Sequence, residues 1–184
     1  MTIINAATHD EGQIDTEAKS QTISSIATPA LPSEAERRQS TVMSVDLAGS
    51  TDMATQIDAE DMRNVITGYQ NTVAGVVTRH DGFIARYMGD GVLCYFGWPR
   101  ANEDDAERAV RAGLEMIARV KKSSGPAGAY LACRVGVATG VVIVGDLIGT
   151  SAAQEAAVIG ETPNLAARLK GLAKPDQLVI AEKT

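Results

Sequence analysis

The stretch from Phe83 to Phe96 reads FIARYMGDGVLCYF, with one apolar run on each side of Gly89-Asp90-Gly91. Short apolar runs with aromatic and β-branched residues are typical of strands, and a Gly-Asp-Gly segment between them is typical of a tight turn. The pattern therefore predicts a β-hairpin with Asp90 at its tip. Two flanking glycines allow a backbone and a ligand to approach each other closely at such a tip.

Another apolar run lies upstream of this hairpin, from Thr41 to Leu47. It predicts a buried strand, and the small residues at 48–51 predict the turn that leaves it. A helix is expected from about Asp58 to His80, because apolar residues recur there at helical spacing and Asp58 is a suitable N-cap.

The region downstream of the hairpin predicts a helix that begins near Asn102 and then two strands. The strands are expected at about 130–138 and 141–144, because Thr139-Gly140 between them is typical of a turn. This part of the chain is therefore predicted to contain a second hairpin.

The C-terminal part predicts one more helix and one more strand. Thr162 and Pro163 are expected to open the helix as N-cap and first helical residue, a position that favours proline. A final strand is expected at 178–180. The whole order predicts an α+β fold, with a mixed, mainly antiparallel sheet flanked by helices that lie on one side of it.

Composition limits the classes of function. The chain has 184 residues and a net charge of −6, which argues against a broad nucleic-acid-binding surface. No run approaches the roughly 18 apolar residues needed to cross a bilayer, and no signal segment is recognisable, so we expect a cytoplasmic protein. Residues 1–37 lack periodicity and are predicted to be a flexible leader or linker, ahead of a domain at 38–184. Cys94 and Cys133 are expected to be reduced core residues.

Two acidic residues carry the first chemical signal. Asp46 ends an apolar strand, where a carboxylate is costly unless a positive group pairs with it, and Asp90 lies at the hairpin tip. On adjacent strands they could hold two divalent ions in the geometry used for displacement at phosphorus, and Mg²⁺ suits such ligands. Both residues also have plainer interpretations, since Asp-Gly is a common turn and Asp46 could be an N-cap or a strand-end residue.

A polar pair on the last helix carries the second signal. Asn164 and Arg168 are four residues apart, so they project from the same face and can act on one ligand. Arginine is suited to spreading the negative charge of a phosphoryl group in its transition state. Leu165, Leu169 and Leu172 are expected to anchor the opposite side of the helix. The alternative for this pair is an ordinary solvated helix face.

Three motifs occur in order and at fitting distances: VDLAGST at 45–51, YMGDGVL at 87–93 and VIGETPNLAARL at 158–169. Together they resemble the signatures of the class III adenylate and guanylate cyclases. The segments 95–99 and 103–109 are also similar to bacterial members of that family. The resemblance covers the chain from about residue 38 to its end and implies the ferredoxin-like, palm-type cyclase core.

The resemblance implies an adenylate cyclase that converts ATP to 3′,5′-cyclic AMP and pyrophosphate with two divalent metal ions, Mg²⁺ or Mn²⁺, in cyclic-nucleotide signalling. By similarity, Asp46 and Asp90 bind both ions, and the backbone carbonyl of Leu47 completes their shell. Phosphate oxygens are held by the backbone amides of Ala48, Gly49, Ser50 and Thr51, at a helix start that favours anions.

The same resemblance gives Asn164 the role of orienting the ribose and Arg168 that of stabilising charge at the α-phosphate. Members of the family act as head-to-tail dimers, with the metal residues from one chain and the Asn/Arg helix from the other. Because this chain holds both sets, a homodimer with two equivalent sites is implied. The chain ends before the closing strands of the family, so it is expected to be a C-terminally truncated part of a longer parent that can carry sensory domains.

Two positions that select the base depart from the adenylate cyclase pattern. Arg86 stands where these enzymes have a lysine and where guanylate cyclases tend to have a glutamate. Ala157 stands where an adenylate cyclase usually has Asp or Thr, and its side chain cannot hydrogen-bond a base. A guanylate or dual-specificity cyclase is therefore an alternative, and so is a catalytically silent module that binds a nucleotide and regulates a partner.

Overall fold

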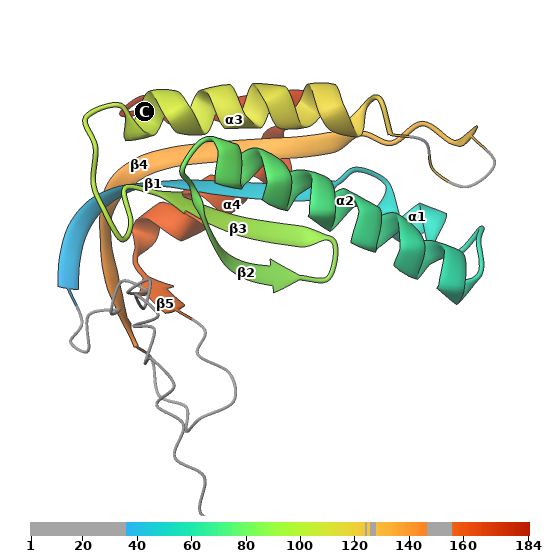
Figure 1. Ribbon diagram of the computed structural model, residues 1–184, viewed down its shortest axis with the longest axis horizontal. Coiled ribbons are helices and arrows are strands. Elements are labelled where there is room, and N and C mark those ends of the chain that lie inside the picture. Colours follow the sequence, from blue (N-terminus) through green and yellow to red (C-terminus); the bar gives the residue numbers. More distant parts are fainter. Residues whose placement is uncertain (1–35, 124, 126–127, 147–155) are drawn as a thin grey trace, which may run out of the picture.

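The computed structural model describes residues 36–123, 125, 128–146 and 156–184. These residues form a six-stranded sheet in the order β2-β3-β1-β4-β5, with β6 paired to β4 (Figure 1). All neighbouring strands are antiparallel except β4 and β6, which are parallel. The predicted α+β fold with a mixed, mainly antiparallel sheet is therefore confirmed.

The strands are β1 (Glu36–Leu47), β2 (Phe83–Met88), β3 (Gly91–Phe96), β4 (Cys133–Asp146), β5 (Ala156–Ile159) and β6 (Gln177–Ile180). The helices are α1 (Ser50–Met53), α2 (Ala59–Arg79), α3 (Asp105–Val120) and α4 (Glu161–Leu172). Strand β1 begins two residues inside the stretch that we expected to be a leader, and residues 1–35 lie outside the described part of the chain. Among the described residues, no helix has both the length and the apolar character needed to cross a bilayer.

The central strand β1 is buried on both faces from Ser40 to Leu47, which explains its nearly continuous apolar run. Alternate side chains point to opposite faces of a strand. Met43 and Val45 belong to the core under α2 and α3, whereas Val42 packs in a second core with Ala166 of α4. Helices therefore cover both faces of the sheet, and Figure 1 shows α3 and α4 on opposite sides of β1 and β4. The prediction that they lie on one side was wrong.

The predicted first hairpin is present as β2 and β3, and its turn is tied to α2. The side-chain amide of Gln70 donates a hydrogen bond to the carbonyl of Gly89 over 2.8 Å. Helix α2 begins as predicted, because the Asp58 carboxylate accepts hydrogen bonds from the backbone N–H groups of Glu60 and Asp61. Helix α2, whose start is capped by Asp58, therefore anchors the turn that carries Asp90.

The predicted second hairpin does not exist, since Thr139 and Gly140 continue a single strand β4 and pair with Thr41 and Ser40 of β1. The glycine marks a close approach instead of a turn: a Cβ there would lie 2.6 Å from the hydroxyl oxygen of Thr162. That hydroxyl donates to the carbonyl of Val141 over 3.1 Å and so connects α4 to β4. Thr162 was expected to be the N-cap of this helix, but it lies inside the helix.

Glu115 of α3 connects the two helices that cover the first core. Its carboxylate lies 2.7 Å from the Nε2 atom of His80, 2.7 Å from Arg119 and 2.8 Å from Arg79. The hydrogen bond with His80, followed by those with the arginines, lowers the pKa of Glu115 from 4.5 to about 2. Because the pKa in the folded state is the lower one, the charged carboxylate stabilises the fold at neutral pH, and this contribution is lost as the pH falls from about 4.5 to about 2.

We expect Glu115→Gln to lower the Tm at pH 7 by about 2 °C, because exposed ion pairs contribute at most about 1 kcal/mol. The difference from the wild type should shrink at pH 3, where part of the contribution is already lost. Thermal unfolding followed by circular dichroism at both pH values measures this. Glu103→Gln, at an exposed position, is the control and should leave the Tm unchanged. An equal deficit of Glu115→Gln at pH 7 and pH 3 would contradict the role of the carboxylate.

Candidate active site

The two predicted acidic residues lie at the same end of neighbouring strands. Val45 of β1 pairs with Val92 of β3. Asp46 is the next residue of β1, and Asp90 lies in the turn just before β3, so both are at the same end of this strand pair. The turn after β1 also reaches the hairpin, because the Ser50 hydroxyl donates a hydrogen bond of 2.6 Å to Oδ2 of Asp90. The structure therefore brings together the end of β1, the following turn and the hairpin tip, as the sequence predicted.

Asp46 is buried, with 8% of its surface exposed, and it is paired with two cations of its own chain. Arg134, directly opposite on β4, donates from Nε to Oδ1 over 3.0 Å and from Nη2 to Oδ2 over 2.9 Å. The ammonium of Lys170 on α4 lies 3.1 Å from Oδ2. The expectation that a carboxylate at this strand end requires positive partners is thus met by a bidentate arginine and a lysine.

A close approach of α4 to β4 is what brings Lys170 to this carboxylate. A Cβ at Gly136 would overlap the backbone of Ala166 and Lys170. Any side chain at this position would push the helix away from the sheet. The absence of a side chain at Gly136 therefore fixes how near α4 can come to Asp46.

The predicted polar pair lies on the opposite, outward side of α4. Asn164 and Arg168 are exposed, while Thr162 and Ala166 of the same helix are buried against the sheet. Successive helical residues are rotated by about 100°, so Arg168 projects about 200° away from Lys170. Arg168 therefore points away from Asp46 of its own chain.

The leucines of α4 do not all anchor the helix, in contrast to the prediction. Leu169 packs in the second core, but Leu165 and Leu172 are 38% and 74% exposed. The buried positions of α4 are instead small or polar residues that fit closely against β4. As a result, the outward face of the helix presents apolar side chains next to Asn164 and Arg168.

The other predicted residues line the turn after β1 and the strands beside it. The backbone N–H of Ala48 donates to the carbonyl of Ala132 over 2.8 Å, so it is already used. Gly49 has a φ of 75°, a left-handed value that favours glycine, and it precedes the short helix α1, which begins at Ser50 and Thr51. The first amides of a helix have no intrahelical acceptor and can bind an anion. The amides at the start of α1 are therefore better candidates for phosphate contacts than the amide of Ala48.

The two predicted base-selecting positions lie on different strands. Arg86 is exposed on β2, next to an irregularity in the pairing of β2 with β3. Ala157 belongs to β5, where it pairs with Gly145 of β4. The backbone thus places one position on each flank of the sheet, and only Arg86 has a side chain that the structure describes.

The donor set at Asp46 and Asp90 fits a small hard cation. Two carboxylates, with oxygens from substrate phosphates, are the ligands that Mg²⁺ prefers, and the Lys170 ammonium already shows that a cation is held against Asp46. In the described part of the chain, no three His, Cys, Asp or Glu side chains cluster as a metal site. Burial, followed by the charge of Asp46, raises the pKa of the neighbouring Cys133 thiol to about 12.

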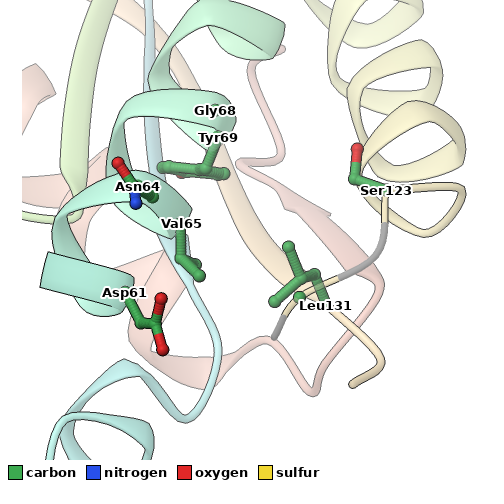
Figure 2. A pocket seen from close by; sticks show the side chains of 8 residues that line it. Asp61, Asn64, Val65, Gly68, Tyr69, Ser123 and Leu131 are labelled. Atoms are coloured by element: carbon green, nitrogen blue, oxygen red, sulfur yellow. The ribbon is translucent and has the colours of Figure 1, made fainter. Parts of the chain in front are cut away.

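A separate hollow of about 340 Å³ lies between α2 and the chain around the start of β4 (Figure 2). It is lined by Asp61, Asn64, Val65, Gly68, Tyr69, Ser123, Gly125 and Leu131. Neither Asp46 nor Asp90 lines it. The candidate active site at the strand ends is therefore distinct from this hollow.

Comparisons with known proteins decide the family. Residues 33–184 match the model of the adenylate and guanylate cyclase catalytic domain. The chain belongs to this family of class III nucleotide cyclases. In this domain, Asp46 and Asp90 lie at the same end of adjacent strands, and Asn164 and Arg168 lie on α4.

Solved cyclases share the fold of this cyclase domain. The guanylyl cyclase Cya2 is 33% identical, with a TM-score of 0.76 over 81% of this chain and 77% of its own. The adenylyl cyclase CyaB from P. aeruginosa is 27% identical, with a TM-score of 0.71 over 82% of this chain and 80% of its own. The family and the fold are therefore shared with cyclases of both base specificities.

A curated relative, an uncharacterized protein of Rhizobium meliloti (strain 1021), is 32% identical over 150 residues. The alignment covers 81% of this chain but 14% of the relative. An uncharacterized protein of Mycobacterium tuberculosis is 30% identical over 151 residues, and that alignment covers 81% of this chain and 26% of the relative. The cyclase domain thus spans about a seventh to a quarter of the length of these relatives.

Two site residues, Arg134 and Lys170, were not found from the sequence. Arg134 is the single charged residue in an apolar run, between Cys133 and Val135, and a lone cation in a buried strand is a signal for a buried anionic partner. Lys170 follows Ala166 by four residues and so lies on the buried face of α4. Both signals were present, but neither identifies its partner without the fold.

Removal of Arg134 tests the pairing at Asp46. We expect Arg134→Met to lower the free energy of unfolding by about 1–2 kcal/mol, because Asp46 loses two charge-assisted hydrogen bonds while it stays buried. Chemical denaturation of the metal-free protein measures this change. Arg111→Met, at an exposed ion pair on α3, is the control and should stay within about 0.5 kcal/mol of the wild type. Equal effects of the two substitutions would show that Asp46 does not depend on Arg134.

Proposed function

We propose that this cyclase domain is an adenylate cyclase, which converts ATP to 3′,5′-cyclic AMP and pyrophosphate with two divalent ions at a homodimer interface. The observation that carries the proposal is that Asp46 and Asp90 lie at the same end of adjacent strands, where Ser50 of the turn after β1 donates a hydrogen bond to Asp90. Two such carboxylates suit a pair of ions that act in an in-line displacement at phosphorus. The family membership supports the same chemistry.

The residues of one protomer have separate tasks in this proposal. Asp46, Asp90 and the backbone carbonyl of Leu47 hold the ions, Mg²⁺ or Mn²⁺. When bound, such ions activate the ribose 3′-hydroxyl as a nucleophile and neutralise the departing pyrophosphate. The amides at Gly49, Ser50 and Thr51 hold phosphate oxygens, whereas that of Ala48 is occupied by Ala132.

The second set of residues, Asn164 and Arg168, serves the partner protomer. Asn164 orients the ribose, and Arg168 stabilises the charge that develops at the α-phosphate. The outward direction of the pair supports this division, since Arg168 points away from Asp46 of its own chain while Lys170 reaches it. A head-to-tail homodimer places each pair at the site of the other chain, so that both sites are complete.

Exposed apolar side chains support such a dimer. Tyr87 and Met88, next to the hairpin tip, are 47% and 48% exposed, and Leu165 and Leu172 flank the polar pair on α4. In a head-to-tail arrangement, the hairpin of one chain would pack against α4 of the other and cover these side chains. The same surfaces that complete the active site would then hold the dimer together.

Base choice rests on Arg86 in this proposal, because Ala157 offers no side-chain hydrogen bond. A guanylate or dual-specificity cyclase is the second candidate. It is favoured by Ala157 and by the likeness to the guanylyl cyclase Cya2. The two candidates share the metal residues and the Asn/Arg pair and differ only in the nucleotide that they turn over.

A mixing experiment tests the shared site. Asp46→Asn and Arg168→Ala should each lower cyclic nucleotide formation from ATP with Mn²⁺ by at least about 100-fold. If metal and arginine residues come from different chains, an equal mixture of the two variants should regain about a quarter of the wild-type rate, because half of the dimers then have one intact site of two. Lys174→Met, at an exposed position, is the control. Full activity of either variant alone, or no recovery in a mixture shown to contain heterodimers, would overturn the assignment.

The kcat/KM values for ATP and GTP distinguish the two candidates. We expect ATP to be the better substrate, and we expect Arg86→Glu to shift the ratio toward GTP by about tenfold, since a carboxylate can accept hydrogen bonds from the guanine edge. Arg63→Glu, on the exposed side of α2, makes the same charge change and should leave the ratio as it is. Preference of the wild type for GTP would favour the guanylate cyclase instead.

A further inference from the structure

Lys170 is a largely buried lysine whose ammonium contacts a buried carboxylate. Its side chain is 21% exposed, and Nζ lies 3.1 Å from Oδ2 of Asp46. The helix backbone at Lys170 is fixed by its contact with Gly136. The close packing of α4 against β4 therefore holds the Lys170 ammonium near Asp46.

The carboxylate of Asp46 has little spare capacity in this arrangement. Arg134 uses one position on each oxygen, and Lys170 adds a second contact on Oδ2. An ionised carboxylate has about four lone-pair positions, so these three contacts leave little room for a divalent ion. Arg134 contacts the carboxylate from the neighbouring strand β4, whereas Lys170 approaches from α4.

An ammonium is a compact point charge and can stand in for a metal ion more closely than a planar guanidinium can. Simultaneous binding of Lys170 and a divalent ion to Oδ2 would place like charges within a few ångströms of each other. Like charges at such a distance repel each other. The divalent ion and the Lys170 ammonium therefore oppose each other's binding to Asp46.

We propose that Lys170 is a positioning residue that holds the cation position at Asp46 until a divalent ion displaces it, and that it thereby weakens the metal affinity of the domain. The inference rests on the proposed function, in which Asp46 is a metal ligand. Lys170 stabilises Asp46 in the metal-free domain and competes with the ion for the same oxygen. Removal of its charge should therefore favour the metal-bound form over the metal-free form.

Calorimetric titration of the nucleotide-free domain with Mn²⁺ tests this inference. Lys170→Met should bind Mn²⁺ about fivefold more tightly than the wild type, a shift of the size expected for the loss of one partly exposed ion pair. Lys170→Gln, which is neutral and polar, should do the same and covers the case in which the methionine variant folds poorly. Lys170→Arg should stay closer to the wild type, because it keeps the charge. Lys174→Met, two residues beyond α4, is the matched control and should not change the affinity.

Thermal unfolding gives a second readout that does not depend on turnover. In EDTA, Lys170→Met should melt below the wild type, because Asp46 loses a partner. With saturating Mn²⁺, its Tm should rise by more than that of the wild type, since tighter binding stabilises the folded state further. A purely structural lysine would lower both Tm values equally.

Two failures are distinguishable. If both neutral variants bind Mn²⁺ no more tightly than the wild type, while Asp46→Asn abolishes binding, the competition is refuted and the metal role of Asp46 stands. If Asp46→Asn binds Mn²⁺ as the wild type does, Asp46 is not a metal ligand, and the proposed function and this inference both fail.

Discussion

A charge that is buried at the end of a central strand has to be paired, and this constraint at Asp46 organises the surrounding structure. The neighbouring strand β4 supplies Arg134 directly opposite, and α4 supplies Lys170 from one face of the sheet. The second contact requires that α4 lie almost against β4, which Gly136 permits. The pairing of Asp46 thus depends both on the register of β1 with β4 and on the distance between α4 and the sheet.

The same constraint defines which face of the sheet carries the chemistry. Side chains alternate along β1, so Asp46 shares the face of Val42, which packs with α4, while Val45 faces α2 and α3. Helices α2 and α3 cover the larger core, and Gln70 of α2 holds the hairpin turn. The charged groups that meet at Asp46 therefore lie on the face of the sheet opposite α2 and α3.

Local rules predicted those parts of the fold that depend on near neighbours. The start of α2 at Asp58 needs only groups within three residues, and the hairpin around Asp90 needs only the two runs beside it. Thr139-Gly140 has the composition of a turn, yet its conformation is decided by Thr162 of a later helix and by pairing with β1. Sequence patterns contain no information on such a distant neighbour, so the second hairpin was predicted wrongly.

The candidate site shows the same division. The motifs around Asp46 and Asp90 could be recognised because each is contiguous, and the spacing of Asn164 and Arg168 placed both on one helix face. The partners of Asp46 could not be assigned, since Arg134 is 88 residues away and Lys170 is still farther. The leucines of α4 misled the prediction for a related reason. Because α4 packs closely against Gly136, its buried side has room for small residues such as Ala166, and Leu172 is exposed.

Helix α4 therefore has two chemically different sides, which the spacing of its residues keeps apart. Lys170 contacts the carboxylate of its own chain, and Arg168, about 200° around the helix, faces outward. In the proposed dimer, the helix whose Lys170 contacts Asp46 at one site is also the helix that presents Asn164 and Arg168 to the second site. Both roles depend on the position of α4 on the sheet, which the close approach at Gly136 fixes.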